Sequence, residues 1–141
     1  MKISPIATLA ALSITGLSLA APAFAGDVAL GEKDFKKCKA CHSIVDNSGE
    51  AIVKGGKTGP NLFGIIGRTA GTEEGFRYKD SIIALGATGF AWDEESIGQY
   101  AVDPTAFLKD KLGDDKAKSG MVKQSLKDPA NVAAYIASVS Q

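Results

Sequence analysis

The sequence has 141 residues, 45% of them hydrophobic, and its 16 basic side chains balance 16 acidic ones. A chain of this length forms a single small domain, and its balanced charge gives no reason to expect a nucleic-acid partner. It contains only two cysteines and one histidine, all within five consecutive residues.

The N-terminus has the pattern of a secretory signal peptide. Lys2 precedes an apolar run over residues 6–20, and Ala23 and Ala25 are the small residues that a cleavage site requires. A membrane anchor is the alternative, but the run is short for a span and ends in a cleavage pattern. We therefore predict a periplasmic, monomeric mature chain, residues 26–141, cleaved after Ala25. It keeps 15 basic and 16 acidic side chains, a net charge of −1.

Cys38, Cys41 and His42 form the sequence C-x-x-C-H. A structural disulfide across so short a loop contributes little, and a redox-active pair is expected in a βαβ setting, whereas this chain shows no run of strands. A structural zinc site needs four ligands, and no second Cys/His pair completes it. The third alternative fits all three residues, because C-x-x-C-H is the attachment signature of c-type haem.

The local pattern supports this interpretation. Residues 30–43 are predicted to form a helix whose start Asp27 can cap. Positions i and i+3 share a helix face, so Cys38 and Cys41 can form thioethers to two vinyl groups on one edge of a porphyrin. His42 then lies where it can bind the iron. The prediction is one covalently attached haem c.

Met121 is the candidate for the second axial ligand of the iron. It is the only methionine left after signal removal, and it lies in a polar, glycine-containing stretch, residues 116–124. The alternative is a core side chain that fills a gap. If both axial positions are filled, no site is open to substrate, which favours electron transfer over catalysis. The rival hypotheses are a haem peroxidase or nitrite-type reductase, and a gas-binding sensor.

The remaining pattern predicts an all-α domain with short helices and long loops. The glycine density of residues 57–71 marks a loop whose backbone closely approaches another group. A short helix should follow Tyr78 and end at Gly86. Aspartates that serve as N-caps, two of them followed by proline, predict three more helices. These lie at residues 93–103, 104–112 (closed by Gly113) and 128–140.

The CKACH motif, the "GPNLFG" loop, the lone distal methionine and the terminal "AAYI" helix together resemble class I cytochrome c, most closely its bacterial cytochrome c2 branch. The resemblance covers nearly all of residues 26–141. It implies that Pro60 accepts a hydrogen bond from the His42 ring and that Gly31, Phe35 and Tyr135 join the first and last helices. It also implies that Arg68, Tyr78 and Trp92 contact the haem propionates, with Tyr100 near the methionine side.

The resemblance further implies a soluble electron carrier that docks on membrane redox complexes. A cytochrome bc complex would be its donor, and a photosynthetic reaction centre or terminal oxidase its acceptor. Lysines flank the two haem-ligating regions in sequence, and we expect them to ring the exposed haem edge and steer docking onto acidic partner faces. These are Lys37, Lys57, Lys109, Lys111, Lys116, Lys118 and Lys123.

Overall fold

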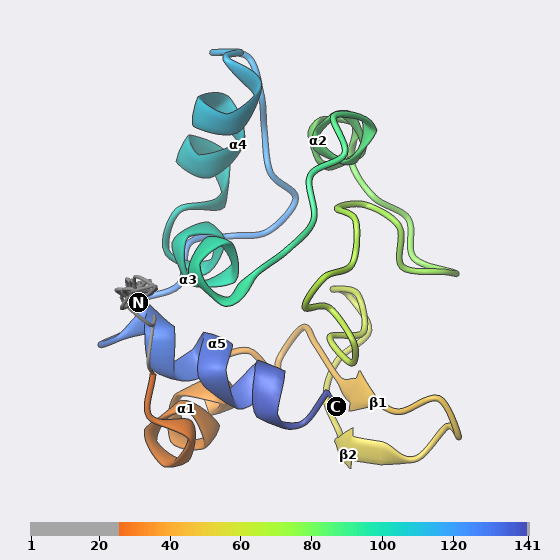
Figure 1. The fold of residues 1–141 in the computed structure, drawn as a ribbon, viewed down its shortest axis with the longest axis vertical. Helices are drawn as coiled ribbons and strands as arrows, with labels where there is room; N and C mark the ends of the chain where they lie inside the picture. The colour runs from red at the N-terminus through yellow and green to blue at the C-terminus, as the bar shows by residue number, and fades with distance from the viewer. Residues whose placement is uncertain (1–25, 141) are drawn as a thin grey trace, which may run out of the picture.

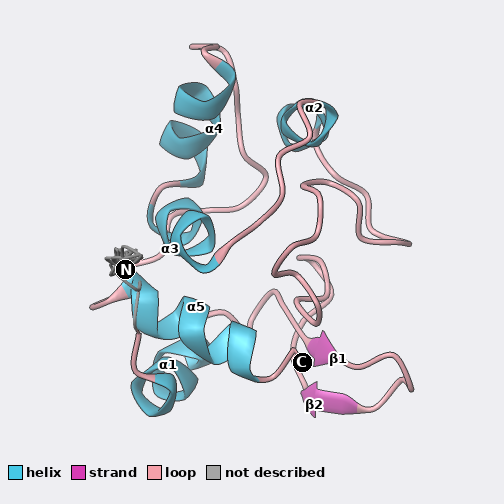
Figure 2. Cartoon of the chain, viewed as in Figure 1, coloured by secondary structure: helices cyan, strands magenta, loops and turns pink. Residues whose placement is uncertain are grey.

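The computed structural model describes residues 26–140, so the predicted signal peptide lies outside the described residues. Short helices are joined by long loops, and the described chain begins near the start of α5 and finishes just past the other end of that helix (Figures 1 and 2). The all-α prediction is confirmed. The elements in chain order are α1 (Val28–Asp34), the 3₁₀ helix η1 (Phe35–Lys37), β1 (Ile44–Val45), β2 (Ala51–Val53), α2 (Asp80–Ala87), α3 (Glu94–Val102), α4 (Pro104–Leu112) and α5 (Pro129–Ser138).

Aspartate caps define where four of the helices begin. Asp27, Asp93, Asp103 and Asp128 each accept a hydrogen bond from a backbone N–H in the first turn of α1, α3, α4 and α5. Such a cap satisfies one of the N–H groups that a helix start leaves without a partner. Asp103 has a second task, because it also ends α3. The predicted caps are therefore confirmed.

The prediction of one helix over residues 30–43 is wrong at its C-terminal end. The α-helix ends at Asp34 and tightens into η1, where the Phe35 carbonyl accepts both the Cys38 and the Lys39 N–H groups. The cysteines then lie on a single turn, closed by the His42 N–H on the Cys38 carbonyl at 2.9 Å. This tighter winding separates the C-x-x-C-H segment from the helix that leads into it.

The prediction that the second helix ends at Gly86 is wrong. Helix α2 continues to Ala87, and the left-handed residue lies further on, at Gly89 (φ +84°). A Cβ at Gly86 would overlap the Ala70 carbonyl oxygen. This glycine therefore allows close packing of α2 on a neighbouring loop and does not serve as a C-cap. A small antiparallel hairpin, β1–β2, was also not predicted.

The first and last helices cross in close contact, side by side in Figure 1. A Cβ at Gly31 would overlap the Asn131 carbonyl oxygen, so only glycine permits this approach. The ring centroids of Phe35 and Tyr135 lie 5.4 Å apart, and the Asn131 amide oxygen accepts the Asp27 N–H at 2.7 Å. The contact expected from Gly31, Phe35 and Tyr135 is confirmed.

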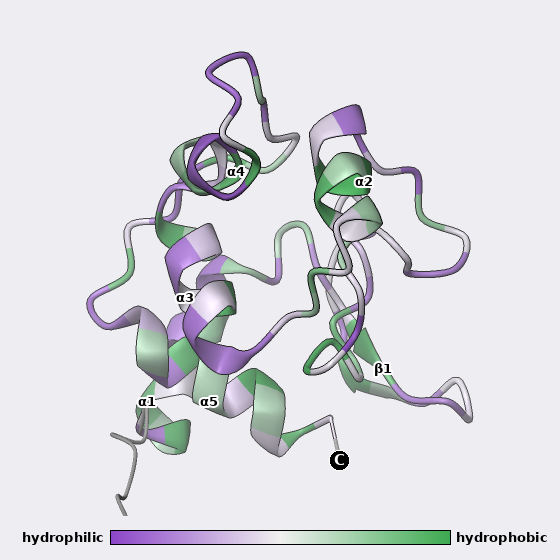
Figure 3. Ribbon diagram, turned by 45° about the horizontal axis from the view of Figure 1, so that its top comes forward, coloured by the Kyte–Doolittle hydropathy of each residue, from purple (hydrophilic) through white to green (hydrophobic). Residues whose placement is uncertain are grey.

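A cluster of aromatic rings connects α3 and α4 to the loop before them. Trp92 lies 5.9 Å from Phe107 in a stacked arrangement and 5.1 Å from Tyr100 in an edge arrangement. The loop after α4 is strongly hydrophilic, whereas α2 and α5 contain more apolar residues (Figure 3). Over residues 26–140, none of the helices has the length and apolar character needed to cross a membrane.

Candidate haem site

The helices and loops enclose a cavity of about 340 Å³, within the range of roughly 300–1,000 Å³ found for ligand pockets. Its walls come from the C-x-x-C-H turn, the glycine-rich loop, the helices α2, α3, α4 and α5, and the segment around Met121. Much of the lining is apolar, including Leu62, Ile65, Ile82, Trp92, Ile97, Leu108, Val132 and Ile136. The cavity is therefore suited to a large apolar group that also needs a few polar contacts.

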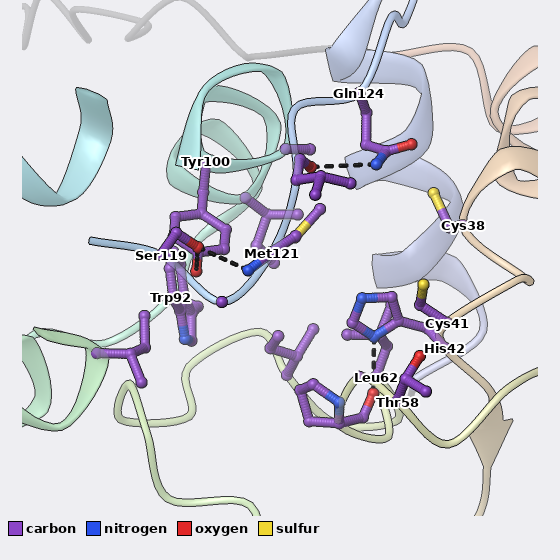
Figure 4. A pocket seen from close by; sticks show the side chains of 18 of the residues that line it. Cys38, Cys41, His42, Thr58, Leu62, Trp92, Tyr100, Ser119, Met121 and Gln124 are labelled. Atoms are coloured by element: carbon purple, nitrogen blue, oxygen red, sulfur yellow. Dashed lines mark hydrogen bonds between the residues drawn. The ribbon is translucent and has the colours of Figure 1, made fainter. Parts of the chain in front are cut away.

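His42 enters this cavity with its ring orientation fixed. The ring is buried, and its Nδ1 lies 2.8 Å from the Pro60 carbonyl oxygen (Figure 4). A carbonyl can only accept, so Nδ1 carries the proton and Nε2 keeps its lone pair for a metal. Burial lowers the pKa of the imidazole from 6.5, against the opposing effect of the Pro60 hydrogen bond. The ring is thus held as a neutral potential ligand.

Gly59 makes room for that ring. A Cβ at this position would lie 2.6 Å from His42 Nδ1 and 2.7 Å from Nε2, where no side chain fits. The glycine density of this loop predicts that its backbone closely approaches another group. The structure identifies the His42 ring as the group that Gly59 approaches.

Cys38 and Cys41 both line the cavity beside His42 (Figure 4). Cys38 is buried and Cys41 is exposed, and no disulfide joins them. Burial is the main reason that the pKa of Cys38 rises to about 11, helped by Asp34 and Cys41 and opposed by Lys37. A redox-active pair needs a thiolate at neutral pH. This local environment therefore disfavours the thiol–disulfide alternative.

Met121 lines the cavity from the segment between α4 and α5. Its N–H donates to Ser119 Oγ at 2.9 Å, and the same hydroxyl is 2.9 Å from Tyr100 Oη. Figure 4 shows Met121 and His42 reaching into one cavity from segments far apart in sequence. Ser119 was not identified from the sequence, where its position two residues before the methionine was the only available signal.

The structure brings most of the other predicted site residues to the cavity. Pro60, Tyr78, Trp92 and Tyr100 all line it. Arg68 is not among the lining residues. Its guanidinium donates to the Asn61 and Phe63 carbonyl oxygens, at 2.8 and 3.3 Å, and forms an ion pair with Glu73.

The seven predicted docking lysines divide into two groups. Lys37 and Lys118 line the cavity, whereas Lys57, Lys109, Lys111, Lys116 and Lys123 do not. Three have contacts within the chain. Lys37 Nζ donates to the Ser125 carbonyl oxygen at 2.6 Å, Lys111 Nζ lies 5.5 Å from the centroid of the Phe107 ring, and Lys123 pairs with Asp103 at 2.5 Å.

These residues fit a c-type haem. The walls are largely apolar, two thiols and an oriented imidazole lie together on one side, and a thioether reaches the same cavity. Imidazole nitrogen and thioether sulfur are both established donors to haem iron. The missing side chain at Gly59 leaves the imidazole the space it occupies. The donor set and the cavity are therefore chemically consistent with the group that the motif predicts.

Comparison with known proteins agrees with this site. No protein-family model matches the chain. Cytochrome c2 of Rhodobacter capsulatus is 62% identical over 139 residues, which cover 99% of this chain and 98% of that protein. Cytochrome c-551 of Roseobacter denitrificans is 53% identical over 86% of this chain and 87% of its own.

Solved structures give the same result. Cytochrome c2 isolated from Rhodobacter capsulatus superposes with a TM-score of 0.80 at 62% identity, covering 82% of this chain and all of that one. Ferric cytochrome c-550 from Paracoccus versutus superposes with a TM-score of 0.78 at 44% identity, covering 83% of this chain and all of that one.

The helical shell and the C-x-x-C-H motif on the cavity wall define the c-type cytochrome class. Because its cytochrome c2 and c-550 relatives are electron-transfer proteins and not enzymes, the chain is an electron-transfer protein of this class. The chain belongs to the class I cytochrome c family, in the group of the bacterial cytochromes c2 and c-550. Its cofactor is one covalently bound haem c, as the motif predicted.

Proposed function

We propose that the chain is a soluble periplasmic electron carrier whose haem iron is bound by His42 on one side and Met121 on the other. Cys38 and Cys41 supply the two thioether bonds. One observation carries the proposal: an imidazole with a free Nε2 and a thioether, 79 positions apart in the sequence, line the same cavity. With both axial positions filled by the chain, no coordination position is left for a substrate.

When bound, the haem supplies a one-electron couple at its iron, and Met/His ligation raises the potential of that couple. The chain holds both ligands by contacts that do not depend on the charge of the iron. The Pro60 carbonyl fixes the His42 ring, and Ser119 Oγ fixes the backbone at Met121. The apolar lining excludes water and disfavours added positive charge, which raises the potential further.

Three side chains are proposed to serve the haem propionates. Tyr78 and Trp92 line the cavity and carry O–H and N–H donors. Arg68 lies outside the lining, and its guanidinium is bonded to two loop carbonyls and Glu73. Its contribution would therefore be a positive charge at longer range together with support of the loop. Tyr100 would act on the methionine side, next to Ser119.

The partners are proposed to be membrane redox complexes: a cytochrome bc complex as donor, and a photosynthetic reaction centre or terminal oxidase as acceptor. Lys37 and Lys118 line the cavity, which supports docking of an acidic face there. The proposed docking surface also includes Lys57, Lys109, Lys111, Lys116 and Lys123. Steering by charge predicts association rates that fall as salt concentration rises. A rate independent of salt would contradict this part of the proposal.

Residues 1–25 are proposed to direct export and to be removed, leaving a monomer that begins at Gly26. The mass of the purified periplasmic protein tests the cleavage site, and sedimentation tests the oligomeric state. A retained N-terminus would favour the membrane-anchor alternative.

The axial ligation is tested by Met121→Ala. We expect loss of the weak red band that a thioether gives with ferric iron, a lower potential, and new binding of cyanide or carbon monoxide. Ile83→Ala is the control, because the Ile83 side chain is 51% exposed and does not line the cavity. An unchanged spectrum and potential in Met121→Ala would refute the proposed ligand. A parent protein that is high-spin and binds these ligands readily would favour the peroxidase, reductase or sensor hypotheses.

A further inference from the structure

The segment that carries Met121, residues 118–125, lies outside any helix or strand. We call it the methionine strap. Two hydrogen bonds lie within it, from the Met121 N–H to Ser119 Oγ at 2.9 Å and from Gln124 Nε2 to the Val122 carbonyl oxygen at 3.1 Å. Neither bond ties it to the rest of the fold, so its position depends on contacts with its neighbours. The Lys118 N–H donates to Ser81 Oγ at 3.0 Å, and the Gln124 N–H donates to the Ala101 carbonyl oxygen at 3.0 Å. Val122 is 70% exposed, so burial of its side chain does little to fix the strap.

Asp103 lies at the corner where α3 ends and α4 begins. Its Oδ1 accepts the Ala106 N–H at 3.1 Å, and its Oδ2 lies 2.5 Å from Lys123 Nζ on the strap. Because Asp103 both ends α3 and caps α4, its carboxylate is held more rigidly than the strap. The pair is partly exposed, with side-chain exposures of 30% for Asp103 and 71% for Lys123.

We propose that Asp103 is a positioning residue that holds the methionine strap in place through Lys123, and thereby keeps Met121 on the iron. The inference rests on the proposed ligation by Met121. Gln124, the residue after Lys123, bonds to Ala101 in α3, so the ion pair and this backbone bond fix adjacent residues of the strap to the same corner. The role of Lys123 is then to hold the strap in addition to any part in docking.

A second lysine holds the strap two residues beyond Lys123. Lys37 Nζ donates to the Ser125 carbonyl oxygen at 2.6 Å, and Lys37 precedes the buried Cys38 at the cavity wall. The strap is therefore tied both to the α3–α4 corner and to the C-x-x-C-H turn. Of these two ties, only the Asp103–Lys123 pair can be removed without changing a residue next to the haem-binding motif.

The experiment measures how fast added imidazole displaces Met121 in the haem-loaded ferric protein. Asp103→Asn removes the charge but keeps a good N-cap for α4, and Lys123→Gln removes the other partner. Each should accelerate displacement about two- to fivefold, as expected for a partly exposed ion pair. The double variant should match either single variant, because both remove one interaction. Lys123→Arg should restore the parent rate.

Amide hydrogen exchange at Gln124 gives a readout that does not require Met121 to be a ligand. Its protection should fall by a similar factor in Asp103→Asn. The matched controls are Asp93→Asn, which changes the cap of α3 in the same way, and Lys54→Gln, which removes a lysine with no ion pair among residues 26–140. Unchanged displacement and exchange in Asp103→Asn, equal acceleration in Asp93→Asn, or additive effects in the double variant would overturn the inference. Faster exchange with no imidazole-displaceable ligand would instead refute ligation by Met121.

Discussion

Gly59→Ala is the substitution whose effect on the haem site can be worked out most directly. Its Cβ would overlap His42 Cε1 and would lie 2.6 Å from His42 Nδ1, whereas ordinary contact begins at 3.4 Å, so the ring or the loop must shift by at least about 0.8 Å. Overpacking of this kind costs about 1–3 kcal/mol. The shift also disturbs the bond from Nδ1 to the Pro60 carbonyl, which is worth about 0.5–1.5 kcal/mol.

We therefore expect Gly59→Ala to lose about 2–4 kcal/mol of unfolding free energy. For a domain of this size, that lowers the melting temperature by about 8–16 °C. Circular dichroism of the haem-loaded protein measures the melting temperature, and the absorption spectrum and potential report on the displaced imidazole.

The control for this prediction is Gly49→Ala. Gly49 has a left-handed φ of +87° and nothing within 4 Å of an added Cβ. It should lose about 1–2 kcal/mol from backbone strain, with no change in spectrum or potential. If Gly59→Ala melted within about 2 °C of the parent and kept its spectrum and potential, the proposed fit between the loop and the His42 ring would be wrong.

Three further predictions concern stability. Gly31→Ala should force α1 away from α5, since its Cβ overlaps the Asn131 carbonyl, and should cost at least about 1–3 kcal/mol in a urea titration. Leu108→Ala, at a site with no exposed surface, should cost about 2–5 kcal/mol, whereas Ile83→Ala, at 51% exposure, should stay within about 1 kcal/mol of the parent. Hydrogen bonds from Ser96 lower the pKa of Asp93 below 3.8, so this cap should contribute fully above that pH and be lost as pH falls through the lower, folded-state pKa. Asp93→Asn should flatten that acid dependence in melting experiments between pH 5 and 2, and an unchanged pH profile would contradict the assignment.

Much of the fold could be predicted because its signals are local. Asp27, Asp93, Asp103 and Asp128 each act within one helical turn, so the sequence alone indicates where those helices begin. The errors occurred where a distant segment determined the outcome. Gly86 looked like a helix end, but the close approach of the Ala70 carbonyl explains the glycine.

The same distinction between local signals and distant contacts applies to the haem site. The C-x-x-C-H motif predicted the haem, and the single remaining methionine led to the prediction of a second ligand, which stays a proposal. Ser119 could not be identified, because its function depends on Tyr100, 19 residues away. Nor could the sequence show that the Arg68 guanidinium donates hydrogen bonds to loop carbonyls and pairs with Glu73. For the same reason it could not show that Arg68 lies outside the cavity lining.

The sequence by itself therefore determined the cofactor chemistry and the helix starts, because each depends on residues a few positions apart. Only the tertiary structure decided which lysines are engaged within the chain, how the His42 ring is oriented and what holds the methionine strap. Lys123 and Asp103 are 20 positions apart, and Lys37 and Ser125 are 88 apart. Contacts over such separations exist only once packing has brought the segments together.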